Sequence, residues 1–524
     1  MKRSTLLIYM VVLVVILCAC SVQGDSGNAA ATSPAEETSD NKKNAMNESK
    51  PTLDPKEQAD NALKEELLSN ADKRREAIRS SETTIRKSED FIPGETYSGK
   101  AYYVSPNGND ENDGLKPETA WATINKVNET ALGSGDAVFF KRGGIWYGQL
   151  KGQAGVTYSA YGEGVKPGLY GTSRVASDPE DWSLLENTEN IWVYKDVVSD
   201  CGGIIFNDGI RYGIKVTPTL NKDPDIKSRL TEDLTFYSLL DKEFFVSNRG
   251  NGIPTGSIDY IPAATALYLR CDKGNPGEVF DSVVFAPCGN TIYPADQTVI
   301  DNLCIKYCGS HAIFGWGVRL IVQNCEFGWI GGSIQFFDEY GIAVRFGNAV
   351  ENDGNYDLYT VRDCYVYQVF DAGLTNQNDG IMENITYVGN LIEYCNYGIE
   401  IFNWNDDGIN IYRNVLVEDN YILFSGEGWC KHRFEYGWNA AIEGHDAQTP
   451  SENYIIRNNV FYEAQHTLLT IGSEDKYAPK LQNNIYVQTK GGKLLRWQGQ
   501  EYSIKKESSK AFLLQLDPGA VIIE

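Results

Sequence analysis

The most regular feature of the chain is a short pattern: a hydrophobic residue, any residue, a small or polar residue, Asn or Cys, any residue and a hydrophobic residue. It occurs at six pairs, which are Asn324-Cys325, Asp363-Cys364, Gly389-Asn390, Asp419-Asn420, Asn458-Asn459 and Asn483-Asn484. Asp301-Asn302 resembles them, and the steps between the second residues of the seven pairs are 23, 39, 26, 30, 39 and 25 residues. Repeats of this length are typical of a solenoid, in which each repeat is one coil stacked on the next.

A second pattern follows these turns: a small residue, an aliphatic residue and a final residue of varying type. The five copies are Ala312-Ile313-Phe314, Ala349-Val350-Glu351, Gly373-Leu374-Thr375, Gly398-Ile399-Glu400 and Ala441-Ile442-Glu443. Strand residues alternate between faces, so an aliphatic residue that points into the coil makes the final residue point outward. We therefore expect the five final residues to form one outward row, in which three are carboxylates.

The chain upstream of the repeats predicts a cap for the solenoid. A strand is expected over 101–104, an amphipathic helix over 119–132 and further strands over 135–150. A helix at this point would cover the open end of the core, which would otherwise be wet and prone to pair with other chains.

Residues 161–280 interrupt the repeat, and we expect a small β-rich insertion there. Strands are indicated at 192–194 and 267–270, with a hairpin turn at Asn207-Asp208-Gly209 between them. Coils are expected to resume at 282–285.

The N-terminus has the features of an export signal. Lys2 and Arg3 precede an apolar run over 6–17, which is too short to span a bilayer comfortably. The run ends in Leu17-Cys18-Ala19-Cys20, which resembles the lipobox of bacterial lipoproteins. The resemblance implies a signal peptide over 1–19, lipid on Cys20 and an extracytoplasmic, membrane-anchored protein.

The segment 20–90 is expected to be a disordered or partly helical tether. No Phe, Trp or Tyr occurs from Ser21 to Asp90, so this stretch cannot build a core of its own. Within it, 56–87 could form a solvated helix, because a few aliphatic residues are spaced among many charges.

The first folded residues resemble a known family. The segments 102–110, 113–114 and 120–124 read YYVSPNGND, DG and AWATI, and they are similar to the first coil of secreted right-handed parallel β-helix proteins of the pectate-lyase-like superfamily. The resemblance implies an all-β fold, with a helical cap and first coils over 91–160 and further coils over 281–524. That superfamily includes polysaccharide lyases, glycoside hydrolases, epimerases and non-catalytic binders, so it leaves the activity open.

Composition narrows the range of partners. The 524 residues carry a formal net charge of -24, from 47 basic and 71 acidic residues, which opposes binding to nucleic acid or to an anionic membrane surface. Aromatic residues make up 12% of the chain, a supply of flat surfaces for the sugar rings of a polysaccharide or oligosaccharide. Of 11 cysteines, nine remain after Cys18 and Cys20 are set aside, and an odd number does not indicate a full disulfide framework. We expect a monomer.

The two 39-residue steps contain extra residues over about 331–344 and 425–438, and both enter the same side of the solenoid. Two loops that overhang one row of carboxylates would form the walls of a cleft. The candidate substrate-binding residues near it are Trp404, Trp429, Trp438, His445, Arg345, Asn376 and Gln377.

The row suggests glycoside hydrolysis, which needs a proton donor and a second carboxylate. We predict Glu400 as acid/base, Asp371 or Glu443 as its partner, and Glu351 as an alternative partner or a binder of substrate hydroxyls. Adjacent coils lie about 4.8 Å apart, so Glu400 and Glu443 would approach a retaining spacing, whereas two coils, about 9.6 Å, separate Glu351 from Glu400 and approach the inverting range.

Three other interpretations remain open. A polysaccharide lyase or epimerase would need a strong base, for which Lys431, Arg433 and Arg345 are the nearest residues in sequence. It could use calcium held by loop acids, for which the candidates are Asp353, Asp357, Asp406, Asp407 and Asp446. A surface glycan-binding protein would use the same groove without chemistry. The carboxylates could also form a solvated strand face, although stacked like charges repel one another. No cofactor is otherwise indicated, and no metal-ligand motif is present.

Overall fold

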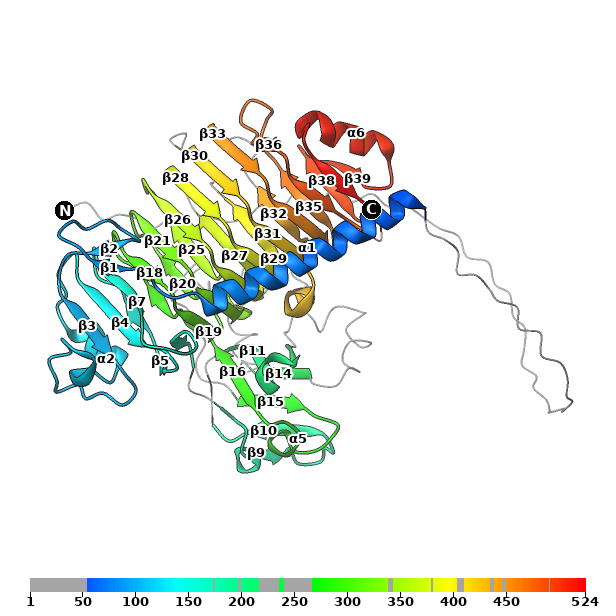
Figure 1. The fold of residues 1–524 in the computed structure, drawn as a ribbon. Helices are drawn as coiled ribbons and strands as arrows, with labels where there is room; N and C mark the ends of the chain where they lie inside the picture. Colours follow the sequence, from blue (N-terminus) through cyan, green and yellow to red (C-terminus); the bar gives the residue numbers. More distant parts are fainter. Residues whose placement is uncertain are drawn as a thin grey trace, which may run out of the picture.

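A computed structural model describes the chain in segments, which are residues 54–172, 175–196, 198, 200–215, 235–239, 266–337, 343–377, 380–402, 410–433, 438–444, 449–489 and 491–524. Figure 1 shows a solenoid whose strands stack side by side along one axis, with the insertion on one flank and a long helix along the side. The predicted fold class, an all-β right-handed parallel β-helix with a helical cap and a β-rich insertion, is confirmed.

One wall of the solenoid is a 10-stranded sheet in which all neighbours are parallel. In spatial order its strands are β3 (Ala101–Val104), β4 (Ala137–Lys141), β7 (Thr157–Tyr161), β18 (Val299–Asp301), β21 (Leu320–Gln323), β26 (Tyr359–Arg362), β28 (Ile381–Val388), β30 (Ile411–Glu418), β33 (Ser451–Arg457) and β36 (Lys480–Gln482).

The remaining walls belong to an 18-stranded sheet, parallel except where β39 pairs with β38. Its strands are β5 (Ile145–Tyr147), β6 (Leu150–Lys151), β8 (Gly168–Tyr170), β17 (Ile292–Tyr293), β19 (Cys304–Cys308), β20 (Ile313–Gly315), β22 (Glu326–Ile330), β25 (Val350–Asp353), β27 (Tyr365–Gln377), β29 (Leu391–Ile401), β31 (Tyr421–Ser425), β32 (Ala440–Gly444), β34 (Val460–Ala464), β35 (Thr467–Ile471), β37 (Ile485–Val487), β38 (Lys493–Trp497), β39 (Gln500–Ser503) and β40 (Val521–Ile523).

The repeated turns are held by a ladder of buried asparagines between the two sheets. The backbone N–H and Nδ2 of Asn390 donate to Oδ1 of Asn420 at 3.0 and 2.9 Å, and Asn420 donates to Asn459 in the same way at 2.9 and 2.9 Å. Asn459 continues the ladder to Asn484, whose Nδ2 donates to Asp517. Each side-chain amide therefore provides hydrogen-bond partners for buried polar groups of the neighbouring coil, which explains why the position is Asn in most repeats.

The residue before each ladder position has a left-handed backbone, with φ of 53° at Asn324, 52° at Asp363 and 70° at Gly389. Only Gly, Asn and Asp adopt this region readily, which explains the small or polar residue of the pattern. Asp301 pairs with Gln323, so Asn302, with φ of 60°, corresponds to Asn324, and Leu303 corresponds to Cys325. The first turn therefore aligns one residue later than we predicted, with Leu303 in the ladder position.

The N-terminal cap is confirmed, with a shorter helix than expected. Helix α2 spans Ile124–Glu129, begins at Thr123, whose side chain accepts the Lys126 N–H, and follows a 3₁₀ turn at Pro117–Thr119. Ile124 and Val127 are buried in the main core, so this short helix closes the first coil. Helix α6 (Glu507–Leu516) packs at the other end.

The insertion contains two small sheets. One has the order β13-β14-β15-β10-β9, where β9 is Trp182–Leu184, β10 is Ile191–Tyr194, β13 is Ile214–Lys215, β14 is Thr235–Leu239 and β15 is Ala266–Arg270. The other has the order β12-β11-β16, where β11 is Cys201–Phe206, β12 is Arg211–Tyr212 and β16 is Val283–Pro287. Because β16 pairs antiparallel with β11, it belongs to the insertion, and coils resume at β17 rather than at 282–285 as predicted.

Helix α1 (Pro55–Ser80) lies along the side of the solenoid, across several coils (Figure 1). Its Leu67, Ala71 and Ile78 are buried against apolar side chains of the coils, and Arg75 forms an ion pair of 2.7 Å with Glu393. The helical content predicted for the tether is confirmed, but this helix is docked rather than solvated. None of the helices in the described segments has the length and apolarity needed to cross a membrane.

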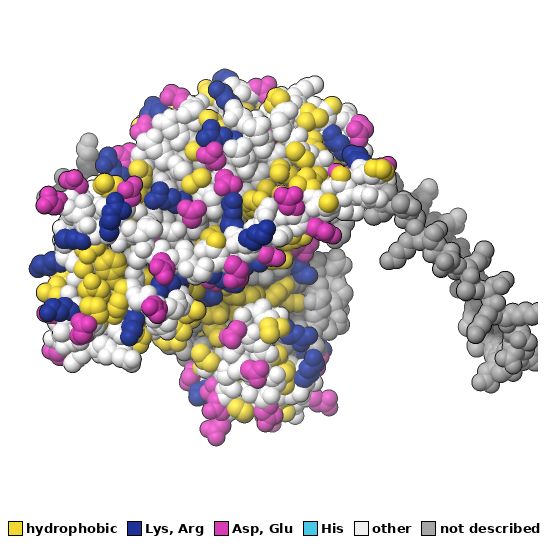
Figure 2. All heavy atoms as spheres, viewed as in Figure 1, with side chains coloured by type: hydrophobic (Ala, Val, Ile, Leu, Met, Phe, Trp, Pro, Cys, Tyr) yellow, Lys and Arg dark blue, Asp and Glu magenta, His cyan; other side chains and the backbone are white. Residues whose placement is uncertain are grey.

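The face seen in Figure 2 mixes charges of both signs over α1 and the coils. The net negative charge is therefore not gathered into one patch on this side of the molecule.

We predict that Asn420→Ala lowers the free energy of unfolding by about 3 kcal/mol, because it leaves buried groups of Asn390 and Tyr387 without their hydrogen-bond partners. Urea unfolding followed by circular dichroism measures the change. Asn414→Gly is the matched control, since Asn414 belongs to an exposed asparagine ladder and has a positive φ that Gly tolerates. Equal losses in both variants would contradict a special role for the buried ladder.

Candidate active site

The strand register places the second sequence pattern in one row, as predicted. Phe314 pairs with Glu351, Glu351 with Thr375, Thr375 with Glu400, and Glu400 with Glu443. The aliphatic residues before them are buried in the main core, so the final residues of the pattern stand on the outer face of the coils.

The row is nevertheless largely shielded from solvent. Glu351 and Glu400 are each 7% exposed, Glu443 is 3% exposed and Thr375 is fully buried. A solvated strand face would leave these carboxylates in water, and the structure excludes that interpretation for them. Charges held in this way need partners or a shared proton.

Glu400 is held by two neighbours on the preceding coil. Its Oε2 accepts a hydrogen bond of 3.2 Å from the Thr375 hydroxyl and one of 2.8 Å from Nε2 of Gln377. Gln377 also donates to Thr375 at 3.0 Å, so the three side chains form one connected group. This oxygen of Glu400 therefore acts as an acceptor in a fixed position.

Asp371 lies beside this group, at a break in the register of β27 between Val369 and Ala372. It is 6% exposed and forms an ion pair with Arg433, which follows the short helix η5 (Gly428–His432) of the second long loop. Burial raises the pKa of Asp371 to about 6; Arg433 opposes the shift, and the negative charges of Glu400 and Glu351 add to it. The carboxylates of Asp371 and Glu400 are thus close enough to repel each other.

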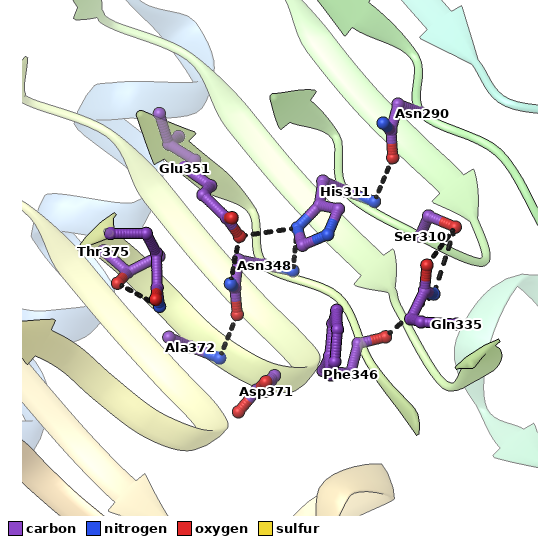
Figure 3. Close-up of polar contacts among 12 residues, drawn as sticks. Asn290, Ser310, His311, Gln335, Phe346, Asn348, Glu351, Asp371, Ala372 and Thr375 are labelled. Carbon is purple, nitrogen blue, oxygen red and sulfur yellow. Dashed lines mark hydrogen bonds and ion pairs between the residues drawn. The ribbon is translucent and has the colours of Figure 1, made fainter. Parts of the chain in front are cut away.

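Glu351 is held by His311 and Asn348 (Figure 3). Nδ1 of His311 lies 2.9 Å from Oε2 of Glu351 and also accepts the backbone N–H of Asn348 at 3.1 Å, and Nδ2 of Asn348 donates to the same oxygen of Glu351. Burial raises the pKa of the Glu351 carboxyl, but His311, Asn348 and Asp353 together lower it below the ordinary value.

The same asparagine connects Glu351 to the segment that carries Asp371. Oδ1 of Asn348 accepts the backbone N–H of Ala372 at 2.7 Å, directly after Asp371 (Figure 3). His311 and Asn348 each precede a residue of the row by three positions, so a search at that spacing could have found them. From the sequence we assigned His311 no part in the site, and its contact with Glu351 corrects that omission.

Glu443 is held by Trp438, whose Nε1 donates to Oε2 at 2.9 Å. The ring of Trp438 is stacked on His466 at 5.3 Å and lies 4.7 Å from the guanidinium carbon of Arg496. Trp438 therefore supports a carboxylate and packs against protein groups, which differs from the platform for a sugar ring that we predicted.

Three other predicted substrate-binding residues are interior. Trp429 is 2% exposed and packs against Trp329 and Phe370, and Arg345 is 1% exposed with its guanidinium carbon 4.7 Å from the Phe370 ring. Asn376 points into the coil, where Nδ2 donates to the Phe402 carbonyl at 3.1 Å. These predictions were wrong because the long loops fold onto the coil wall and because Asn376 follows Thr375 by one strand position.

Trp404, His445 and Cys20 lie outside the described residues. Like Trp438, Gln377 is a predicted substrate-binding residue that contacts a carboxylate of the row, in this case Glu400.

Both long loops and the insertion support this region. The first loop forms a hairpin of β23 (Ser333–Phe337) and β24 (Ala343–Phe346). The insertion meets it through a buried ion pair, in which Nζ of Lys215 lies 2.7 and 2.6 Å from the two carboxylate oxygens of Asp200, and Asp200 accepts the Ile334 N–H. The insertion thus fixes the hairpin that carries Arg345.

No group of three or more His, Cys, Asp or Glu side chains suited to a metal ion occurs among the residues that the structure describes. Loop acids that we considered for calcium include Asp406, Asp407 and Asp446, which lie outside those residues.

We predict that His311→Leu lowers the free energy of unfolding by about 3 kcal/mol near neutral pH, because it leaves a buried Glu351 carboxylate without the imidazole that contacts it. In the native protein the lowered pKa of Glu351 stabilises the fold above the ordinary carboxyl pKa, and this contribution is lost as the pH falls through the lowered value. Without His311, burial raises that pKa, so the deficit relative to the native protein should shrink in acid. Urea unfolding at about pH 7 and about pH 4.5 measures both effects.

The control is the double variant His311→Leu with Glu351→Gln. It buries no carboxylate without a partner, so it should recover most of the lost free energy of unfolding. A deficit that is the same at both pH values would show that His311 acts through packing alone.

No family model matches the chain, and no curated protein matches it. Solved structures that resemble it include a complex of XylC with xylose (13% identity, 76% of this chain and 71% of that chain, TM-score 0.43). Others are a glycoside hydrolase (12%, 81% and 96%, TM-score 0.43) and the pectate lyase Pel9A (10%, 75% and 69%, TM-score 0.38). At these scores, the activity of this chain has to be argued from its own site.

Proposed function

We propose that this protein is a glycoside hydrolase in which Asp371 and Glu400 are the two catalytic carboxylates. The observation that supports this most directly is their placement on neighbouring strands, β27 and β29, where both are shielded from solvent and repel each other. A pair of carboxyls in different environments, one of which holds a proton, is the arrangement that glycosidic bond cleavage requires.

Asp371 is the proton donor in this proposal. A carboxyl with a pKa of about 6 keeps its proton at mildly acidic pH and can give it to a leaving oxygen. Glu400 is the partner carboxylate in this proposal, because its Oε2 is fixed as an acceptor by the Thr375 hydroxyl and Nε2 of Gln377. These contacts reverse the roles that the sequence alone led us to expect.

Glu443 and Glu351 are assigned supporting roles. The first accepts a hydrogen bond from Trp438, and the second is engaged by His311 and Asn348. The pKa of Glu351 is lowered, because His311 and Asn348 outweigh its burial, whereas the pKa of Asp371 is raised.

The lyase interpretation has less support from the contacts. Arg433, one of its candidate bases, is the ion-pair partner of Asp371, and a guanidinium remains protonated in proteins. Lys431 is exposed to solvent.

We predict that Asp371→Asn and Glu400→Gln each lower kcat by about 10³-fold, the loss expected when an acid or its partner is removed. Before this comparison, digestion of a glycan panel followed by mass spectrometry identifies the substrate and shows whether each cleavage adds one water. In the wild type, kcat/KM should fall as the pH rises above about 6, because Asp371 then loses its proton.

Glu452→Gln is the matched control, an exposed carboxylate on the other sheet, and it should retain full activity. Thermal unfolding of each variant separates lost catalysis from lost folding. Unsaturated products would support the lyase instead, and binding that survives Glu400→Gln with no product from any glycan would support the non-catalytic binder.

We also propose that the chain is an extracytoplasmic lipoprotein. The support is the apolar run over 6–17 and the lipobox-like segment Leu17-Cys18-Ala19-Cys20. Cells expressing the full chain with radiolabelled palmitate should label the wild type but not Cys20→Ser, measured by gel autoradiography. The control is Cys18→Ser, which keeps the lipidated position; equal labelling of wild type and Cys20→Ser would contradict the assignment.

A further inference from the structure

Trp316 stands out among the large hydrophobic side chains that remain exposed. It is 58% exposed, and the described part of the chain has no other tryptophan among its strongly exposed hydrophobic residues. It directly follows β20, the strand that contributes Phe314 to the row. A large ring left in water at this place is a candidate contact for a ligand.

The register places Trp316 on a second outward line, two positions after the row. Gly315 pairs with Asn352, so Trp316 lies beside Asp353, and Asp353 pairs with Gln377. Gln377 is the side chain that holds Glu400. Trp316 is thus aligned along the solenoid axis with the carboxylate group.

The packing of Trp316 leaves much of its ring available. The rings of Phe314 and Trp316 meet edge to face at 5.1 Å. This contact orients the indole while more than half of its surface stays open. An oriented, exposed aromatic ring is suited to stacking against the C–H face of a sugar.

We propose that Trp316 binds a sugar ring at a distance from the cleaved bond, and that the substrate is a neutral oligosaccharide long enough to reach both places. This rests on the proposed function of Asp371 and Glu400. Three strand spacings separate β20 from β29, about 14 Å, so one monosaccharide cannot reach both places.

The chemical class of the substrate follows from the charges along the path. Between Trp316 and Glu400 the two outward lines carry Glu351, Asp353, Thr375 and Gln377. The basic groups next to them, His311 and Arg433, are already engaged by Glu351 and Asp371. Carboxylates and amides accept and donate hydrogen bonds to hydroxyls, whereas a chain of uronic acids would meet like charge.

The test compares wild type, Trp316→Ala and Trp316→Phe on two substrates of the same sugar. One is a neutral oligosaccharide that the panel shows to be cleaved, and the other is its p-nitrophenyl monoglycoside. Trp316→Ala should raise KM for the oligosaccharide about tenfold and change the monoglycoside by less than about twofold, and Trp316→Phe should recover most of the loss.

Tyr147→Ala is the control, because Tyr147 is 49% exposed and lies on β5, beside a different line of strands. Equal loss on both substrates, or no loss on the oligosaccharide, would overturn the inference, as would tighter binding of an oligogalacturonide than of the neutral chain.

If the wild type cleaves nothing, the proposed function fails, and calorimetry with neutral oligosaccharides then decides the inference by itself. Binding that weakens about tenfold in Trp316→Ala supports it, and binding that is absent or unchanged overturns it.

Discussion

The structure depends on one constraint: each coil must hydrogen-bond to the next in a fixed register. The backbone ladders of the two long sheets provide this pairing, and the buried asparagines from Asn390 to Asn484 repeat it at the turns with side-chain amides. A slip of one residue would turn every core aliphatic outward and leave every ladder amide without a partner. The register is therefore strongly specified, and everything attached to the coils inherits its position.

The carboxylate row is a consequence of that register. Glu351, Glu400 and Glu443 come from segments up to 92 residues apart in sequence, since the first and last are positions 351 and 443, yet strand pairing places them in line. Their shielding has another origin, because it comes from parts outside the regular coils. The second long loop provides Arg433 and Trp438, and the buried Lys215–Asp200 pair fixes the insertion against the first loop. A rigid scaffold thus sets where the acids lie, and irregular segments set their electrostatics.

Helix α1 has a comparable relation to the scaffold. It contributes charged residues that would be unremarkable on a free helix, but Arg75 and Arg79 reach the carboxylates of Glu393 and Glu326 on the coils. Because the apolar side of α1 covers Tyr365, Leu391 and Leu423, the segment that follows the proposed lipid anchor is packed along the solenoid. The position of residue 54, the first described residue, is therefore fixed relative to the coils.

The sequence by itself determined the coil repeat, the turn chemistry and the membership of the row, because these follow from local rules. A left-handed turn residue is most readily Gly, Asn or Asp, and strand residues alternate between faces. The same rules placed the cap helix and the hairpin turn of the insertion, with errors of a few residues where a boundary depends on packing, as at β16.

Only the tertiary structure decided which acids are chemically distinct. The raised pKa of Asp371 depends on burial, on Arg433 from a loop 62 residues later and on Glu400 from the next strand. Likewise, the sequence predicted that Trp429 and Trp438 would bind sugar rings. The folded loops turn both rings toward other protein groups, whereas Trp316 remains exposed. Local patterns carry no information on how an irregular loop folds back, because that depends on contacts between segments that are distant along the chain.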